Sequence, residues 1–302
     1  MVVLPAVADH PLWWISIAVV GLVVGLISGM FGIGGNFLLI PVLSTYFGVP
    51  IQVAVGTSLC QIIGTGVSAL HRHQRRRNGE IRIDILMVAG GLIGSLAGAY
   101  CFSRLAEAGT ISIAAGHIST VKFAISIIYM CLLSLVAGWM FYDSRKGAKP
   151  PTVSDAPLIR IGLAPFVRLP KLKATISAMT GAYLGLAMGF LSGLVGMGGG
   201  VILMPVLIYG MGMGVRMAAG TGILALICCA AMGTISHAIQ GHVHLGLAMT
   251  LLLGSTIGAP LGANVTLKID PATTRKIFAM LALLTAGSVA WDLARILLLK
   301  SG

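Results

Sequence analysis

The residues best suited to chemistry in this chain lie in a glycine- and serine-rich stretch that occurs twice. The first copy, residues 25–43, reads GLISGMFGIGGNFLLIPVL, and the second copy, residues 189–207, reads GFLSGLVGMGGGVILMPVL. A constant offset of 164 residues aligns them without a gap, and the register continues to Gly56-Thr57 and Gly220-Thr221. Two apolar helices matched by chance would share Leu and Val, whereas these copies share glycines, serines and prolines. The sequence therefore predicts a duplicated break in the backbone.

Such a break suits the binding of an anion. A helix that starts at a glycine cluster directs free N–H groups and the positive end of its dipole at whatever lies there. Glycine also lets a ligand approach the backbone closely. Serines of the preceding helices, and polar side chains at the start of the next helix, would complete the site. The candidate substrate-binding residues are Ser28, Gly34, Gly35, Asn36, Thr57, Ser58, Gln61, Ser192, Gly198, Gly199, Gly200 and Thr221.

Glycine has a second explanation in membrane helices, because small residues spaced four apart allow two helices to pack closely. We expect this role for the glycine rows within residues 21–29 and 90–98. For Gly34-Gly35 and Gly198-Gly199 a ligand-facing role is favoured, since packing explains poorly why two glycines stand beside an unusually short helix.

The composition places these stretches in a membrane. Apolar residues make up 57% of the chain and charged residues 9%, which excludes an ordinary soluble domain. The lengths of the apolar runs predict an α-helical bundle. The net charge of +12 is attributed to loops that face the cytoplasm, and no nucleic-acid partner is expected. The five cysteines lie in apolar segments and indicate no disulfide framework.

Ten apolar segments divide into two membrane repeats, residues 1–142 and 175–302, joined by a polar cytoplasmic connector at 143–174. The first repeat contains segments at about 12–31, 35–47, 53–71, 83–102 and 121–142, and the second at about 175–195, 199–210, 217–236, 245–265 and 276–299.

The distribution of charge predicts the topology. If the chain changes side at every segment and starts outside, sixteen of the 20 Lys and Arg residues lie in the cytoplasm. If the short segments enter the membrane and return without crossing it, fourteen of the Lys and Arg residues lie in the cytoplasm, and the termini are cytoplasmic. The first arrangement satisfies the positive-inside rule better and puts the termini in the periplasm. An odd number of crossings per repeat then turns the second repeat upside down relative to the first, as in many secondary transporters.

The short segments Gly35–Phe47 and Gly199–Gly210 carry the most information. Each spans roughly 20 Å as a helix, which is too little for a hydrocarbon core of about 30 Å. Each begins at the glycine cluster and contains a proline. The predicted fold is therefore an all-α polytopic membrane protein with two inverted five-segment repeats, each with a short broken or re-entrant helix that starts at a Gly-rich bend.

Other kinds of chemistry find little support in the sequence. No phosphate-binding loop, HExxH or Gly-x-Ser-x-Gly pattern is present, so no nucleotide, cofactor or enzymatic activity is expected. Histidines near residues 71–73 and 237–244 leave a divalent metal (nickel or cobalt) permease as the alternative function. Asp292 is expected to pair with Arg295, and no buried carboxylate is evident that would carry a proton.

At these motifs the sequence resembles the sulfite exporter TauE/SafE family of bacterial inner-membrane anion permeases. The resemblance rests on the two glycine stretches with their following Pro-Val-Leu, on Gly56-Thr57-Ser58 and Gly220-Thr221, and on the Gly-Ser-x-x-Gly-Ala pattern at 94–99 and 254–259. It implies outward transport of small sulfur-containing anions such as sulfite or organosulfonates and leaves a homo-oligomer open. The second copy has Gly200 where the first has Asn36, so the two halves are expected to contact the ligand unequally.

Overall fold

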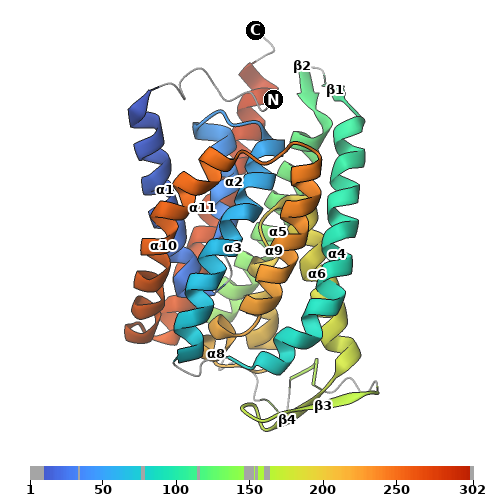
Figure 1. Cartoon of the computed structure of the whole chain (residues 1–302), viewed down its shortest axis with the longest axis vertical. Helices are drawn as coiled ribbons and strands as arrows, with labels where there is room; N and C mark the ends of the chain where they lie inside the picture. Colours follow the sequence, from blue (N-terminus) through green and yellow to red (C-terminus); the bar gives the residue numbers. More distant parts are fainter. Residues whose placement is uncertain are drawn as a thin grey trace.

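The computed structural model describes residues 10–32, 35–75, 79–113, 116–145, 153, 156–159 and 164–299. Within these ranges, eight helical segments are long and apolar enough to cross a membrane. Figure 1 shows them as one upright bundle. Large apolar side chains on the outside of the bundle are exposed, among them Leu12, Leu253 and Trp291. A lipid environment satisfies such a surface, and the all-α membrane class is confirmed.

The first half of the chain follows the predicted segments. Its elements are α1 (Pro11–Phe31), α2 (Asn36–Pro41), the π-helical turn η2 (Val42–Tyr46), α3 (Ile51–Arg75), α4 (Ile81–Glu107), the antiparallel hairpin of β1 (Thr110–Ile113) and β2 (Gly116–Ser119), and α5 (Thr120–Arg145).

The helices of the second half repeat this order, but the long central helix is broken and the hairpin precedes the first helix. Its elements are the antiparallel hairpin of β3 (Phe166–Leu169) and β4 (Ala174–Ser177), α6 (Ala178–Val195), α7 (Gly200–Pro205), the π-helical turn η4 (Val206–Gly210), α8 (Val215–Gly220), α9 (Ile223–Ile239), α10 (Leu245–Lys268) and α11 (Pro271–Leu299).

Glycines start both short helices, as predicted. The helix preceding each bend ends at a glycine in the left-handed conformation, Gly32 with φ 66° and Gly196 with φ 74°. The short helix then begins after a second left-handed glycine, Gly35 or Gly199. L side chains rarely adopt this backbone conformation, which accounts for the glycines at these turns.

The prolines of the short helices do not stop them. After Pro41 and Pro205 the chain continues for five residues as a π-helical turn. A proline lacks the N–H that an α-helix needs and its ring crowds the preceding turn, so the wider turn accommodates it.

The glycine rows pack helices against each other, as expected. A Cβ atom on Gly29 of α1 would lie 1.9 Å from the carbonyl oxygen of Ala259 on α10. A Cβ atom on Gly25 would lie 2.5 Å from Cα of Ser255. Only glycine permits this separation of α1 and α10.

Helices α6 and α4 make the same contact in the other half. A Cβ atom on Gly193 of α6 would lie 2.1 Å from the carbonyl oxygen of Ser95, and one on Gly189 would lie 2.0 Å from that of Gly91. Adding 164 to the residue numbers on α1 gives the residues on α6, and adding 164 to those on α4 gives the residues on α10. The first helix of each half therefore packs against a helix of the other half: α1 against α10, and α6 against α4.

The ends of the bundle differ in what they carry. In Figure 1, α1 begins and α11 ends at the upper end, whereas β3 and β4 lie at the lower end, where α6 begins. Helices α1 and α6 therefore enter the bundle from opposite ends. This geometry agrees with an odd number of crossings per half, and the inverted relation between the halves stays a prediction.

Candidate functional site

Two hydrogen bonds join the start of α2 to α3 and to the second glycine bend. The Asn36 side-chain amide donates to the backbone oxygen of Ser58 at 2.6 Å. The Ser58 hydroxyl donates to the backbone oxygen of Gly196 at 3.0 Å. The two bends come from opposite halves of the chain, and α3 passes between the α2 start and the Gly196 bend. The structure thus brings together Asn36, Ser58 and the second bend, and their role in binding stays a prediction.

Several polar atoms in this region are buried and have no partner among the residues that the structure describes. They are both side-chain amide atoms of Gln61, the Oδ1 atom of Asn36 and the hydroxyl of Ser192. All three side chains have zero exposure. A buried polar atom without a hydrogen bond costs about 1–3 kcal/mol, so such atoms mark a place where a ligand or ordered water belongs.

Helical geometry places Gln61 on the side of α3 that faces the second half. Residues three and four apart share a helix face, so Gln61 follows Ser58 along that face. Ile62 beside it contacts the same bend, because a Cβ atom on Gly198 would lie 2.8 Å from its Cδ1 atom. Ser192 lies one turn before Gly196 and accepts the Gly196 N–H with its backbone oxygen.

Close packing also accounts for the predicted bend glycines. A Cβ atom on Gly35 would lie 2.5 Å from the backbone oxygen of Val24 and 3.0 Å from Cβ of Ser28. A Cβ atom on Gly199 would lie 2.3 Å from the backbone oxygen of Met188. Gly200 opens α7 and is buried, whereas Gly34 lies outside the described residues. Packing is therefore sufficient to explain Gly35 and Gly199.

The two threonines of the predicted site lie far from each other. Thr57 accepts the backbone N–H of His244 at 3.1 Å, next to the upper turn between α9 and α10. Thr221 accepts the backbone N–H of Glu80 at 3.0 Å, at the lower start of α4. The two bonds are equivalent under the 164-residue offset. Each threonine ties one half of the chain to the other, at opposite ends of the bundle.

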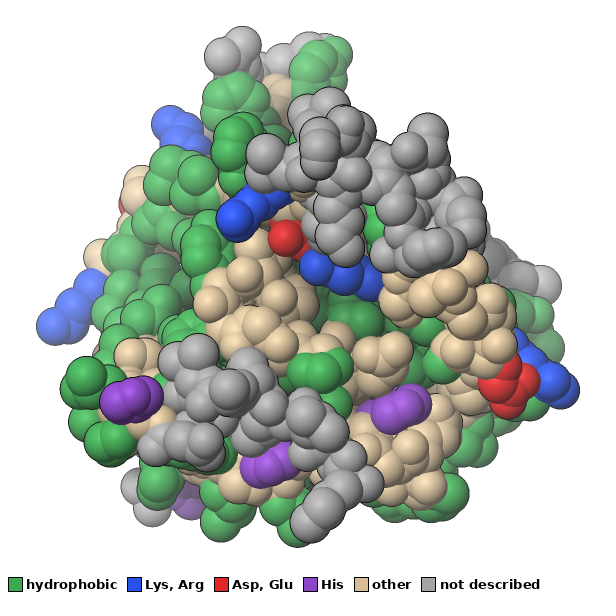
Figure 2. All heavy atoms as spheres, turned by 90° about the horizontal axis from the view of Figure 1, so that it is seen from above, with side chains coloured by type: hydrophobic (Ala, Val, Ile, Leu, Met, Phe, Trp, Pro, Cys, Tyr) green, Lys and Arg blue, Asp and Glu red, His purple; other side chains and the backbone are tan. Residues whose placement is uncertain are grey.

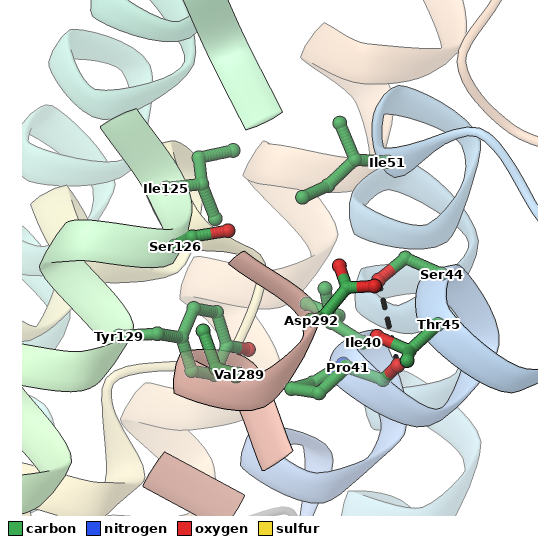
Figure 3. Close-up of a pocket in the computed structure, with 10 residues that line it drawn as sticks. All are labelled: Ile40, Pro41, Ser44, Thr45, Ile51, Ile125, Ser126, Tyr129, Val289 and Asp292. Atoms are coloured by element: carbon green, nitrogen blue, oxygen red, sulfur yellow. Dashed lines mark hydrogen bonds between the residues drawn. The ribbon is translucent and has the colours of Figure 1, made fainter. Parts of the chain in front are cut away.

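A narrow pocket lies beside the short helix of the first half, between η2, α5 and α11 (Figure 3). Ser126 and Tyr129 of α5 and Asp292 of α11 reach it, together with Ser44 and Thr45. The Tyr129 hydroxyl is buried without a partner among the described residues.

The carboxylate of Asp292 is neutralised from another helix. It pairs with Lys122 of α5 at 2.9 Å, so the expected pair with Arg295 is wrong. The Lys122 ammonium on the facing helix α5 reaches the Asp292 carboxylate, whereas Arg295, one turn further along α11, forms no ion pair with it among the described residues. Figure 2 shows basic and acidic side chains near a recess in the upper face.

The histidines of the upper turn act as structural groups. The Nε2 atom of His237 bonds the backbone oxygen of Gly193 at 2.9 Å, and its Nδ1 atom lies 3.5 Å from that of His242. His244 caps α10 by accepting the Leu247 N–H. Burial lowers the pKa of His242. The described residues contain no group of three or more His, Cys, Asp or Glu side chains that could hold a metal ion.

Asp84 is a candidate functional residue that sequence reasoning missed. The sequence makes no buried carboxylate evident, yet the exposure of Asp84 is 2% and it lies in α4 against the start of α9. Its carboxylate accepts the backbone N–H groups of Gly222 and Leu224. The signal available in the sequence was a carboxylate inside an apolar segment, at the second residue of the segment 83–102.

Comparison with known proteins identifies the family. The family model described as sulfite exporter TauE/SafE matches residues 17–289. A probable membrane transporter protein of Bacillus subtilis, YunE, is 27% identical over 92% of this chain and 98% of its own length. A second one from Bacillus subtilis, YdhB, is 29% identical over 83% of this chain and 89% of its own length.

The similarity extends to archaea and has no counterpart among solved structures. A probable membrane transporter protein of Methanocaldococcus jannaschii is 26% identical over 85% of this chain and 88% of its own length. No solved structure matches the chain. The family match spans both glycine bends and every helix from α2 to α10. The chain belongs to the sulfite exporter TauE/SafE family of membrane transporters.

Proposed function

We propose that the protein is a secondary transporter that exports small sulfur-containing anions, such as sulfite or organosulfonates, across the bacterial inner membrane. The observation that carries this proposal is the set of buried, unpartnered polar atoms on Asn36, Gln61 and Ser192, beside two glycine bends. The description of the matching family supports a sulfur oxyanion as the substrate.

The proposed binding uses neutral donors rather than a fixed positive charge. The Gln61 amide and the Ser192 hydroxyl donate hydrogen bonds to the oxyanion, and the starts of α2 and α7 add the positive ends of their dipoles. The Gln61 and Asn36 carbonyl oxygens accept from water or from a protonated oxyanion. A site without a buried cation releases the anion readily, because no buried ion pair has to be broken.

Alternating access is proposed to arise from rocking of two inverted halves. The equivalent threonine bonds support this, because Thr57–His244 joins the halves at the upper end and Thr221–Glu80 joins them at the lower end. If the bond at one end breaks while the bond at the other end stays intact, the site opens to one side of the membrane at a time.

The distribution of charge supports an orientation with the lower end in the cytoplasm. Export of an anion is then favoured by an inside-negative potential, by about 2.3 kcal/mol per charge per 100 mV. The elements at the lower end carry, among other cations, Arg82, Arg168, Lys171, Lys173, Arg216, Lys268, Arg275 and Lys276, and those at the upper end carry Arg104, Lys122 and Arg295.

The test is transport by the purified protein in proteoliposomes. Solid-supported-membrane currents are recorded after jumps of sulfite, sulfoacetate, taurine or sulfate. We expect a current for at least one sulfur-containing anion, and we expect Gln61→Ala and Ser192→Ala to abolish it. Ser16→Ala serves as the matched control, because Ser16 is an exposed serine on α1 that bonds only its own helix.

Two outcomes would contradict the proposal. One is silence of the wild-type protein toward every anion. The other is normal current in both site variants, which would place the site elsewhere. The metal-permease alternative is not favoured, because His237, His242 and His244 bond backbone or each other and the described residues contain no cluster of metal ligands.

A further inference from the structure

Asp84 bridges the two halves of the protein inside the membrane-spanning part of α4. Its two carboxylate oxygens accept the backbone N–H groups of Gly222 and Leu224, the latter at 3.4 Å. These amides stand at the start of α9, where a helix has N–H groups without intrahelical partners. A carboxylate at 2% exposure that is held by backbone amides is costly to keep in a membrane protein unless it has a function.

The surroundings of Asp84 differ between the two halves. In the first half α3 runs unbroken from Ile51 to Arg75. In the second half the equivalent helix is interrupted at Thr221-Gly222, with Gly222 at φ 90°. The residue equivalent to Asp84 under the 164-residue offset is Ala248, so the other half has no such carboxylate. In the part of the chain that the structure describes, the carboxylate and the interruption occur together at the lower end, and neither has a counterpart at the equivalent positions 248 and 58.

The interruption can act as a hinge. Thr221 is in an extended conformation between the short helix α8 and the long helix α9, and the Gly222 backbone is left-handed. Such residues absorb the dihedral changes of a hinge motion. While Asp84 is ionised, its charge-assisted bonds hold α9 against α4 and keep the hinge in one position.

We propose that Asp84 binds the proton that couples transport to the proton gradient and that its protonation releases α9 from α4 at the lower end of the bundle. The inference rests on the proposed transport function. Uptake of a proton converts the carboxylate into a neutral acid, which accepts hydrogen bonds weakly. The bonds to the α9 amides are then lost, and the halves part at that end. Release of the proton restores the bonds and closes it.

The other ionisable groups around Asp84 come from three elements. Glu80 lies one turn earlier on α4, and its carboxylate accepts the backbone N–H of Lys171 in the β3–β4 turn at 3.0 Å. The Lys171 ammonium donates to the backbone oxygen of Gly79. The third group is the thiol of Cys228 on the facing helix α9, which lies close enough to Asp84 to interact electrostatically with it.

The experiment compares anion and proton movement in the same proteoliposomes. Anion counterflow reports binding and exchange, and a pH dye trapped inside the liposomes reports proton movement driven by an anion gradient. We expect the wild-type protein to move both. Asp84→Asn keeps the shape but can neither take up nor release a proton, so we expect it to lose anion-driven proton movement and to slow counterflow. Glu107→Gln, which removes an exposed carboxylate from the other end of α4, should retain both.

A second measurement needs no substrate and therefore tests Asp84 even if no anion flux is detected. Infrared difference spectra of the reconstituted protein between two pH values should show a carboxylic-acid band that is missing from Asp84→Asn and present in Glu107→Gln. If Asp84→Asn is unstable, Asp84→Glu replaces it and should keep proton movement with a shifted pH profile.

The outcomes separate the two proposals. Absence of any anion flux in the wild-type protein contradicts the transport function, while the infrared band still decides whether Asp84 takes up a proton. Anion flux without proton movement, or proton movement that survives in Asp84→Asn, overturns the role of Asp84 and leaves the transport function standing.

Discussion

Replacement of Gln61 by methionine distinguishes a binding site from ordinary helix packing. Both amide atoms of Gln61 are buried and unpartnered among the described residues. Each such atom costs about 1–3 kcal/mol of stability unless water or a ligand satisfies it. Methionine has nearly the same length and volume and no strong polar atom, so it fills the space without that cost. The variant should therefore be more stable than the wild-type protein and unable to transport.

The expected size of the effect follows from these values. Ordered water will satisfy part of the amide, so we expect a gain of about 1–3 kcal/mol rather than the sum for two atoms. One kcal/mol shifts the midpoint by roughly 2–4 °C for domains of this order of size, so the thermal midpoint should rise by several degrees. Thermal unfolding in detergent, followed by intrinsic fluorescence, measures this shift, and the anion-driven current measures transport.

Thr65→Val provides the control on the same face of α3. The Thr65 hydroxyl is buried but donates to the backbone oxygen of Gln61 at 3.0 Å. Removing it should bring no stabilisation, because no unsatisfied group is removed. A lower midpoint for Gln61→Met would show that the amide is satisfied in the protein. A current equal to that of wild type would show that it takes no part in binding, and either result refutes the reasoning.

Three further predictions concern packing, helix propensity and pH. Gly29→Ala should lower stability by about 1–3 kcal/mol, because its Cβ would lie 1.9 Å from a backbone oxygen of α10; thermal unfolding in detergent checks this. Gly287→Ala, where a Cβ atom meets nothing within 4 Å, should leave stability unchanged or raise it by up to about 1 kcal/mol in the same assay. Burial lowers the pKa of His242, so below about pH 6.5 the unfolded chain binds a proton that the folded chain does not, and stability falls as the pH drops. His242→Gln should reduce that fall between about pH 7.5 and about pH 5.5, and an unchanged pH dependence would exclude His242 as its source.

Much of the fold could be predicted because the membrane imposes simple rules. An apolar run of sufficient length becomes a helix, since lipid offers no other partner for the backbone. The starts of α2 and α7 were predictable from Gly35 and Gly199, because only glycine takes a left-handed turn without strain. The apolar pattern gave no hint of the break at Gly222, since a bend inside a buried segment leaves composition unchanged.

The candidate site was only partly predictable. The repeat drew attention to Asn36 and Ser58, and their hydrogen bonds join the two halves. The same repeat grouped Thr57 with Thr221, which lie at opposite ends of the bundle. In an inverted repeat, two equivalent residues lie close together only if they are near the symmetry axis that relates the two halves. The 164-residue offset says which residues are equivalent but not how far they lie from that axis.

By itself the sequence determined the membrane class, the duplicated register and the positions of the bends, because hydropathy and glycine conformation act locally along the chain. The tertiary structure alone decided that Ser58 reaches Gly196, that Lys122 neutralises Asp292 and that Asp84 meets the start of α9. These contacts join residues on different helices, and their selection depends on how helix faces are rotated when the glycine rows lock α1 to α10 and α4 to α6.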